Sequence, residues 1–436
     1  MGGIVGSGIF INPYVVAGLV HTPALILATW VAGGAIAMAG ALIYAELADR
    51  MPRVGGQYAY LRDAYHPAVG FLYGWAALLV IHAGGTAAVV VTFSKYFREL
   101  SHGAGSESAT SIGVICALVV INCLGVRAGS GVQSGFMILR ILAISLIVAS
   151  GAWFLAHSPA APEIPWRPVL DRPPSFGLLS VFGAAMVPVL FGYGGWQTSN
   201  YIASEIREPR RNLPRALVLG VAGIIALYLA VNFIYVQALS PAGLAATSTP
   251  ASGVMRLAFG SRGASLVAAL IAISTLGFLS QAMLSYPRMY FAMAADGLLP
   301  SSFARLNART RVPVGTIILQ GAVTIAVVLL GTYEQILSYV VVMDWLFFGL
   351  TASCIFVFRA REKREAAAAG PPQAPGFRVP GHPWTTGLFV AVAWLVTINT
   401  IYKYPRNAAV AMCILLAGIP FYYLFRGRAR RSNGSE

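Results

Sequence analysis

The chain has 436 residues, of which 57% are hydrophobic and only 10% are charged. Soluble domains carry roughly 25% charged residues, so a soluble protein of this size would lack polar surface. The mean hydropathy of +0.72 and the apolar runs of about 20 residues, a length that spans lipid, predict an all-α polytopic protein in the lipid bilayer. The net charge of +15 is interpreted as membrane topology and not as nucleic-acid binding, because basic residues gather in cytoplasmic loops.

We predict about twelve spans within a single transmembrane domain, residues 1–436. In chain order they cover approximately residues 2–22, 24–46, 67–94, 110–125, 131–156, 178–202, 214–238, 263–287, 313–331, 336–358, 384–402 and 407–425. The longest connector, AAAAGPPQAPGFRVPGHP, is rich in Pro and Gly and is expected to be a loop. The distribution of Lys and Arg, including the basic tail 426–436, predicts cytoplasmic N- and C-termini.

Glycine clusters interrupt two of these spans, at GGIVGSGIF in the first and at FGYGGWQTSN in the sixth. Glycine weakens a helix by roughly 1 kcal/mol relative to alanine, so both segments are expected to be broken helices. Their separation by five spans means that they cross the membrane in opposite directions. This predicts an inverted repeat of residues 1–156 and 178–358, with two further spans at 384–425. The alternative is that the glycines only allow close helix packing.

A helix broken inside the membrane exposes free N–H groups at the start of one half and free C=O groups at the end of the other. The N–H end attracts an anion and the C=O end attracts a cation. Two facing broken helices would therefore suit a zwitterion, such as the α-carboxylate and α-amine of an amino acid.

These segments, with YAELADRMPRVGGQYAYLRDAYHPAVGFLYGW and SYPRMYFAMAADGLLP, resemble the amino acid–polyamine–organocation superfamily, and within it the L-type amino acid transporter branch. The resemblance covers nearly the whole chain and implies a LeuT-like fold, a 5+5 inverted repeat with two extra helices. It implies secondary active transport of amino acids by alternating access in the inner membrane of a cell of bacterial type. The half-helix that precedes the glycine break in this family is missing before Met1, so the first span is expected to be truncated and a longer chain to be the functional form.

The resemblance also implies the substrate contacts. The backbone N–H groups of Ser7 and Gly8 and the Ser7 hydroxyl would hold the carboxylate. The backbone carbonyls of Ile4, Phe191 and Gly194 would hold the amine. Trp196 and Gln197 would lie near the end of the pocket that receives the substrate side chain. Trp196 could instead be plain core packing. Relatives that accept cationic side chains can carry an acidic residue at the position of Gly194, so neutral substrates are expected here.

Arg140 lies in the middle of an apolar span, where a charge is costly and points to a function. The resemblance places it where the L-type branch usually has a lysine in the space that sodium fills in sodium-coupled relatives. Arginine stays protonated, so we expect sodium-independent exchange, with Ser274 and Thr275 as candidate partners of Arg140. Snorkelling of Arg140 to an interface is the alternative.

Three carboxylates are candidate gate or proton sites. Asp344 is expected near the outer end of its span, where a solvated helix end is the alternative. Glu46 and Glu205 are expected at cytoplasmic span ends, where loop arginines could pair with them or where they could simply lie at the interface. A proton-coupled importer that uses Asp344 is therefore an alternative mechanism. His82 is expected to be a satisfied core histidine.

No cluster with metal-ligand spacing, no phosphate-binding loop and no nucleophile constellation is visible, so neither an enzyme nor a cofactor is predicted. Animal members of the branch that pair with a single-span glycoprotein use a cysteine in the loop that corresponds to KYFRELSHGAGSESAT. That loop has no cysteine here, so a disulfide-linked heavy chain is not expected. A non-transporting amino acid sensor is the alternative from a different class, although the chain offers only a short basic tail for signalling.

Overall fold

The computed structural model describes residues 6–51, 56–101, 103–125, 130–159, 162–197, 208–369 and 376–433. All regular secondary structure in these ranges is helical. Nine spans in them are long and apolar enough to cross a membrane, and shorter apolar helices occupy the first, fourth and ninth predicted spans. The prediction of an all-α polytopic membrane protein is confirmed.

The first seven helices cover the first five predicted spans and the connector between the second and third. They are α1 (Gly8–Leu19), α2 (Pro23–Arg50), α3 (Gly56–Ala64), α4 (Pro67–Ala76), α5 (His82–Leu100), α6 (Glu107–Cys123) and α7 (Ser130–His157). The sequence interpretation did not include α3, which lies in the expected connector and packs against α4.

The remaining helices follow the predicted spans but several extend beyond them. They are α8 (Phe176–Tyr193), α9 (Pro209–Ala245), α10 (Pro250–Ala295), the 3₁₀ turn η3 (Ser301–Ala304), α11 (Val314–Leu330), α12 (Tyr333–Ala369), α13 (Trp384–Lys403) and α14 (Pro405–Asn433). Helix α9 is kinked at Ser240, with φ of 62°, and α10 is kinked at Gly260, with φ of 66°. The predicted sixth span is shorter as a helix than expected, because α8 stops at Tyr193, just before two glycines.

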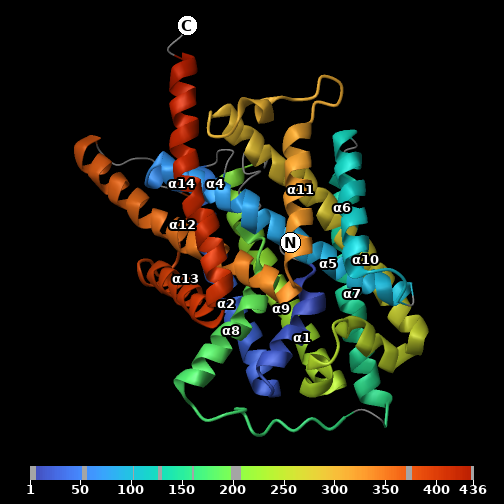
Figure 1. Cartoon of the computed structure of the whole chain (residues 1–436). Helices are drawn as coiled ribbons and strands as arrows, with labels where there is room; N and C mark the ends of the chain where they lie inside the picture. The colour runs from blue at the N-terminus through green and yellow to red at the C-terminus, as the bar shows by residue number, and fades with distance from the viewer. Residues whose placement is uncertain are drawn as a thin grey trace.

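Helices α4 and α5 form one tilted rod across the middle of the bundle (Figure 1), joined by the π-helix η1 (Ala77–Ile81). A π-helix is rare and often marks a functional site. The rod packs against α10 and α12. An aromatic cluster of Trp30, Tyr193 and Tyr228 joins α2, α8 and α9, with ring centroids 5.1–5.8 Å apart.

The two ends of the bundle differ in charge. We call the end that carries Arg50, Arg359 and Arg361 the basic face, which is at the top of Figure 1 where α14 ends. The other end, where residues 162–175 run below the helices, is called the loop face. The cavity described next lies between the two faces.

Candidate functional site

Helix α1 begins inside the protein at Ser7, its N-terminal cap residue. Ser7 is buried, its side chain makes no capping hydrogen bond, and its Oγ has no partner among the described residues. The first N–H groups of any helix lack acceptors within the helix and carry partial positive charge. The start of α1 therefore presents hydrogen-bond donors that an anion can use.

Helix α8 ends near the start of α1, with Gly194 as its C-terminal cap residue. The N–H of Gly194 donates to the carbonyl of Phe191 at 3.1 Å, and the N–H of Gly195 donates to Oε1 of Gln197 at 2.9 Å. Gly195 has φ of 102°, which favours glycine. The last carbonyl groups of a helix carry partial negative charge, so the end of α8 can attract a cation.

A close approach of glycines brings these two helix ends together. A Cβ atom added at Gly8 would lie 2.7 Å from the Cα of Gly192, and helices α1 and α8 pack directly against each other. The start of α1, which carries partial positive charge, thus lies beside the end of α8, which carries partial negative charge.

A cavity of about 90 Å³ opens at these two ends. Five regions contribute its wall: the start of α1, the junction of η1 and α5, the end of α8, and one face each of α10 and α12. The lining residues are Gly6, Ser7, Gly8, Ile81, His82, Gly85, Val89, Leu190, Phe191, Gly194, Gly195, Gln197, Phe278, Tyr286, Val340, Val341, Asp344, Trp345 and Phe348.

Most of the described residues that the resemblance placed at the substrate line this cavity, and Trp196 does not. Ser7, Gly8, Phe191, Gly194 and Gln197 belong to its wall. Trp196 is not among the lining residues. It is buried in an aromatic cluster, with ring centroids 4.7 Å from Tyr44 and 4.9 Å from Phe348. Ile4 lies outside the described residues.

His82 is the first residue after the π-helix and also lines the cavity. Its ring stacks on Tyr286 at 3.8 Å, and its Nδ1 is 2.8 Å from the Tyr290 hydroxyl. The histidine is buried and hydrogen-bonded, as the sequence interpretation expects of a core residue. Its place in the cavity wall was missed, because nothing in the sequence marks the π-helix that sets its orientation.

Asp344 differs from its expected position. The sequence interpretation places it near the outer end of its helix, whereas it lines the cavity together with Trp345 and Phe348. The spacing 340, 341, 344, 345 and 348 on α12 is that of one helix face. That pattern could have identified the face from sequence, but not the direction in which it points.

Arg140 of α7 is buried and reaches α10. Its Nε and Nη2 atoms donate to the carbonyl oxygen of Ser274 at 3.3 and 3.0 Å, and its guanidinium lies 5.6 Å from the ring centroid of Phe278. The structure therefore brings Arg140 and Ser274 together. The Thr275 hydroxyl instead donates to carbonyls of its own helix, those of Ile271 and Ala272.

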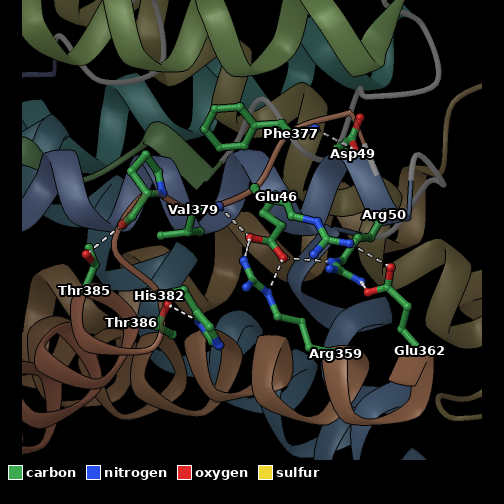
Figure 2. Close-up of polar contacts among 12 residues, drawn as sticks. Glu46, Asp49, Arg50, Arg359, Glu362, Phe377, Val379, His382, Thr385 and Thr386 are labelled. Carbon is green, nitrogen blue, oxygen red and sulfur yellow. Dashed lines mark hydrogen bonds and ion pairs between the residues drawn. The ribbon is translucent and has the colours of Figure 1, made fainter. Parts of the chain in front are cut away.

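At the basic face, Glu46 of α2 is fully buried and is the centre of an ionic cluster (Figure 2). Its carboxylate accepts two hydrogen bonds from Arg359 of α12, at 2.9 and 2.7 Å, and one from Nε of Arg50, at 2.9 Å. The backbone N–H of Val379 donates a fourth, at 2.7 Å. Charge-assisted bonds of this kind are stronger than neutral ones, so α2, α12 and the α12–α13 connector are held together here.

The cluster continues beyond Glu46. Glu362 accepts from Arg50 at 3.0 Å and from Arg378 at 3.1 Å, and Asp49 accepts from the N–H of Phe377 at 3.2 Å. Residues 376–383 are therefore fixed to α2 at two acidic side chains. Glu205, the other carboxylate expected at this side, lies outside the described residues.

In the described ranges, no group of three or more His, Cys, Asp or Glu side chains could hold a metal ion. The four cysteines, Cys116, Cys123, Cys354 and Cys413, are free thiols. The described residues of the cavity wall offer hydrogen-bond donors, acceptors and apolar surface.

A helical membrane bundle in which the start of one helix and the end of another meet at a cavity is typical of membrane transporters. A sequence model of the family described as amino acid permease matches residues 1–424. The chain therefore belongs to the amino acid permease family. It is an amino acid transporter and not an enzyme.

Individual relatives agree with this assignment. The chain is 29% identical over 443 residues to the serine/threonine exchanger SteT of Bacillus subtilis (strain 168). This alignment covers 98% of this chain and 94% of that protein. It is 28% identical over 443 residues to the large neutral amino acids transporter small subunit 2 of Rattus norvegicus, covering 97% and 78%. It is also 28% identical over 442 residues to the Asc-type amino acid transporter 1 of Homo sapiens, covering 97% and 80%.

Proposed function

We propose that the chain exchanges small or medium neutral L-amino acids across the membrane by alternating access, independently of sodium. Relatives named as a serine/threonine exchanger and as a large neutral amino acid transporter support exchange and neutral substrates. The observation that carries the sodium independence is the position of Arg140.

In this proposal the substrate carboxylate binds the N–H groups of Ser7 and Gly8 and the Ser7 hydroxyl. The substrate amine binds carbonyls at the end of α8, those of Phe191 and Gly194. The support is that both helix ends line one cavity with opposite partial charges, and that the buried Ser7 Oγ lacks a partner among the described residues. The Phe191 ring covers the bound substrate from the loop face.

Arg140 takes the place of a sodium ion. Its guanidinium is held by the carbonyl of Ser274, the kind of oxygen that coordinates a hard cation. A second cation at that oxygen would be repelled by the first, because like charges close together in a low dielectric interact strongly.

The proposed topology places the basic face in the cytoplasm, with both termini, because Lys and Arg are enriched on that side of membrane proteins. Residues 1–156 and 178–358 are proposed as the inverted repeats, and the support is that glycine clusters lie at corresponding places, where α1 begins and α8 ends. The transporter is proposed to work in the cell (inner) membrane without a disulfide-linked heavy chain.

Uptake into proteoliposomes tests the proposal. Vesicles with purified protein are loaded with unlabelled alanine or left empty, and labelled alanine is added in sodium or choline buffer, with and without a pH gradient. Uptake should need internal alanine and should be equal in sodium and choline. Sodium-dependent uptake would contradict the role of Arg140.

A proton-coupled importer is the second candidate, and the position of Asp344 in the cavity wall favours it. That mechanism requires uptake into empty vesicles driven by the pH gradient alone. Substrate binding without any flux would support a sensor instead of either transporter.

A further inference from the structure

Asp344 is the single acidic side chain among the described residues that line the cavity. Its neighbours on the same face of α12 are apolar: Val340, Val341, Trp345 and Phe348. A carboxylate in such surroundings is costly unless a hydrogen-bond donor or a positive charge compensates it.

No described residue supplies that compensation. Other carboxylates of the bundle, such as Glu46 and Glu334, accept hydrogen bonds from side chains, whereas no hydrogen bond or ion pair joins Asp344 to any residue of the described ranges. The side chain is partly accessible from the cavity. A substrate bound in the cavity could therefore supply the hydrogen-bond donor that Asp344 lacks.

The other polar groups of the wall already have partners or proposed roles. His82 is paired with Tyr290, and Oε1 of Gln197 accepts from the N–H of Gly195. The ends of α1 and α8 are matched to the carboxylate and the amine of an amino acid. Asp344 is thus left to contact the side chain of the substrate.

A neutral donor is favoured over a cationic one at the cavity wall. The Arg140 guanidinium lies 5.6 Å from the ring centroid of Phe278, which lines the cavity. Its positive charge disfavours a second cation nearby, whereas a hydroxyl group adds only a donor.

We propose that Asp344 selects amino acids that carry a hydroxyl group on the β-carbon, by accepting a hydrogen bond from that hydroxyl. The aromatic walls at Phe191, Phe278, Tyr286, Trp345 and Phe348 leave room for a short side chain. This inference rests on the proposed function, since it takes the cavity as the amino acid site.

Competition in exchange assays tests it. Proteoliposomes of the full chain, loaded with unlabelled alanine, take up labelled alanine in the presence of two isosteric pairs: serine against 2-aminobutyrate, and threonine against valine. In each pair a methyl group replaces the hydroxyl. A site that hydrogen-bonds a hydroxyl rejects the analogue that lacks it, so serine and threonine should compete at least about tenfold better than their partners. Asp344→Asn, which keeps an acceptor oxygen, should retain the preference in part, and Asp344→Leu should abolish it.

The matched control is Glu365→Gln, an exposed acid on the same helix, which should behave as the unchanged protein. If alanine exchanges but the unchanged protein does not distinguish serine from 2-aminobutyrate, the selectivity role is overturned while the exchanger stands. The same holds if Asp344→Leu removes uptake driven by a pH gradient and leaves the serine preference intact, which would assign Asp344 to proton coupling. Absence of any alanine flux in the unchanged protein would overturn the exchanger itself and, with it, the role of Asp344.

Discussion

Gly8 and Gly192 lie so close that a Cβ atom added to Gly8 would stand 2.7 Å from the Cα of Gly192. Real Cβ atoms do not approach backbone carbon this closely, and backbone cannot move aside as a flexible side chain can. The contact sets the spacing between the start of α1 and the end of α8, and therefore the geometry of the cavity that both ends line.

Gly8→Ala should reduce alanine exchange by at least about tenfold, because small displacements at a binding site can cost that much or more. Gly18→Ala is the matched control, since Gly18 is on the same helix and has no atom within 4 Å of an added Cβ. Exchange rates of both variants, normalised to reconstituted protein, provide the measurement. Equal rates for the two variants would show that the close approach does not govern the site.

Glu46→Gln should destabilise the protein by about 3–5 kcal/mol, the usual effect of removing one partner of a buried ion pair. The Arg359 guanidinium would remain beside a neutral amide that cannot accept its bidentate pair. Thermal unfolding in detergent should show a clearly lower midpoint. Glu365→Gln, on the exposed part of α12, should leave the midpoint unchanged, and an unchanged midpoint for Glu46→Gln would refute the structural importance of the cluster.

Asn12 is fully buried and joins three helices. Its amide donates to the carbonyl of Pro188 at 2.6 Å, and its Oδ1 accepts from the Tyr333 hydroxyl at 2.7 Å. Asn12→Ala removes the acceptor of the Tyr333 hydroxyl and the bond between α1 and α8, which should cost about 1–3 kcal/mol of stability. A double-mutant cycle with Tyr333→Phe should give a coupling energy of about 1 kcal/mol. Strict additivity of the two variants would mean that the bond contributes nothing to stability.

His382 makes stability at the basic face dependent on pH. Burial, together with the charge of Arg359, lowers the pKa of His382 below its usual value. A lowered pKa in the folded state means that the unfolded chain binds the proton more readily. Stability is therefore full above the unfolded pKa of about 6.5 and is lost as the pH falls through the lower folded pKa.

The measurement is the unfolding midpoint between pH 8 and pH 5, compared with that of His382→Gln. The unchanged protein should lose more stability than the variant on acidification. If the unfolding midpoints of the two proteins fall equally with pH, His382 does not cause the loss of stability on acidification.

Much of this architecture was predictable because it depends on local properties of the sequence. Long apolar runs specify the spans, and the glycine clusters around Gly8 and Gly194 mark where α1 begins and α8 ends. The orientation of each helix about its own axis was not predictable, since it depends on neighbours distant in sequence. For this reason Asp344 and His82 were not placed in the cavity wall, and Trp196, expected near the substrate, lies among aromatic rings instead. The π-helix before His82 changes the orientation of α5 about its axis, and no pattern in the sequence predicts this change.

The anchoring of residues 376–383 to α2 has a mechanical consequence. Glu46 holds Arg359 of α12 and the N–H of Val379 at the same time, and Asp49 holds Phe377 (Figure 2). Any motion that separates the ends of α2 and α12 must either break these bonds or pull the segment that leads into α13. Helices α13 and α14 are thus coupled to α2 and α12, and the proposed opening of the basic face requires the hydrogen bonds at Glu46 to break.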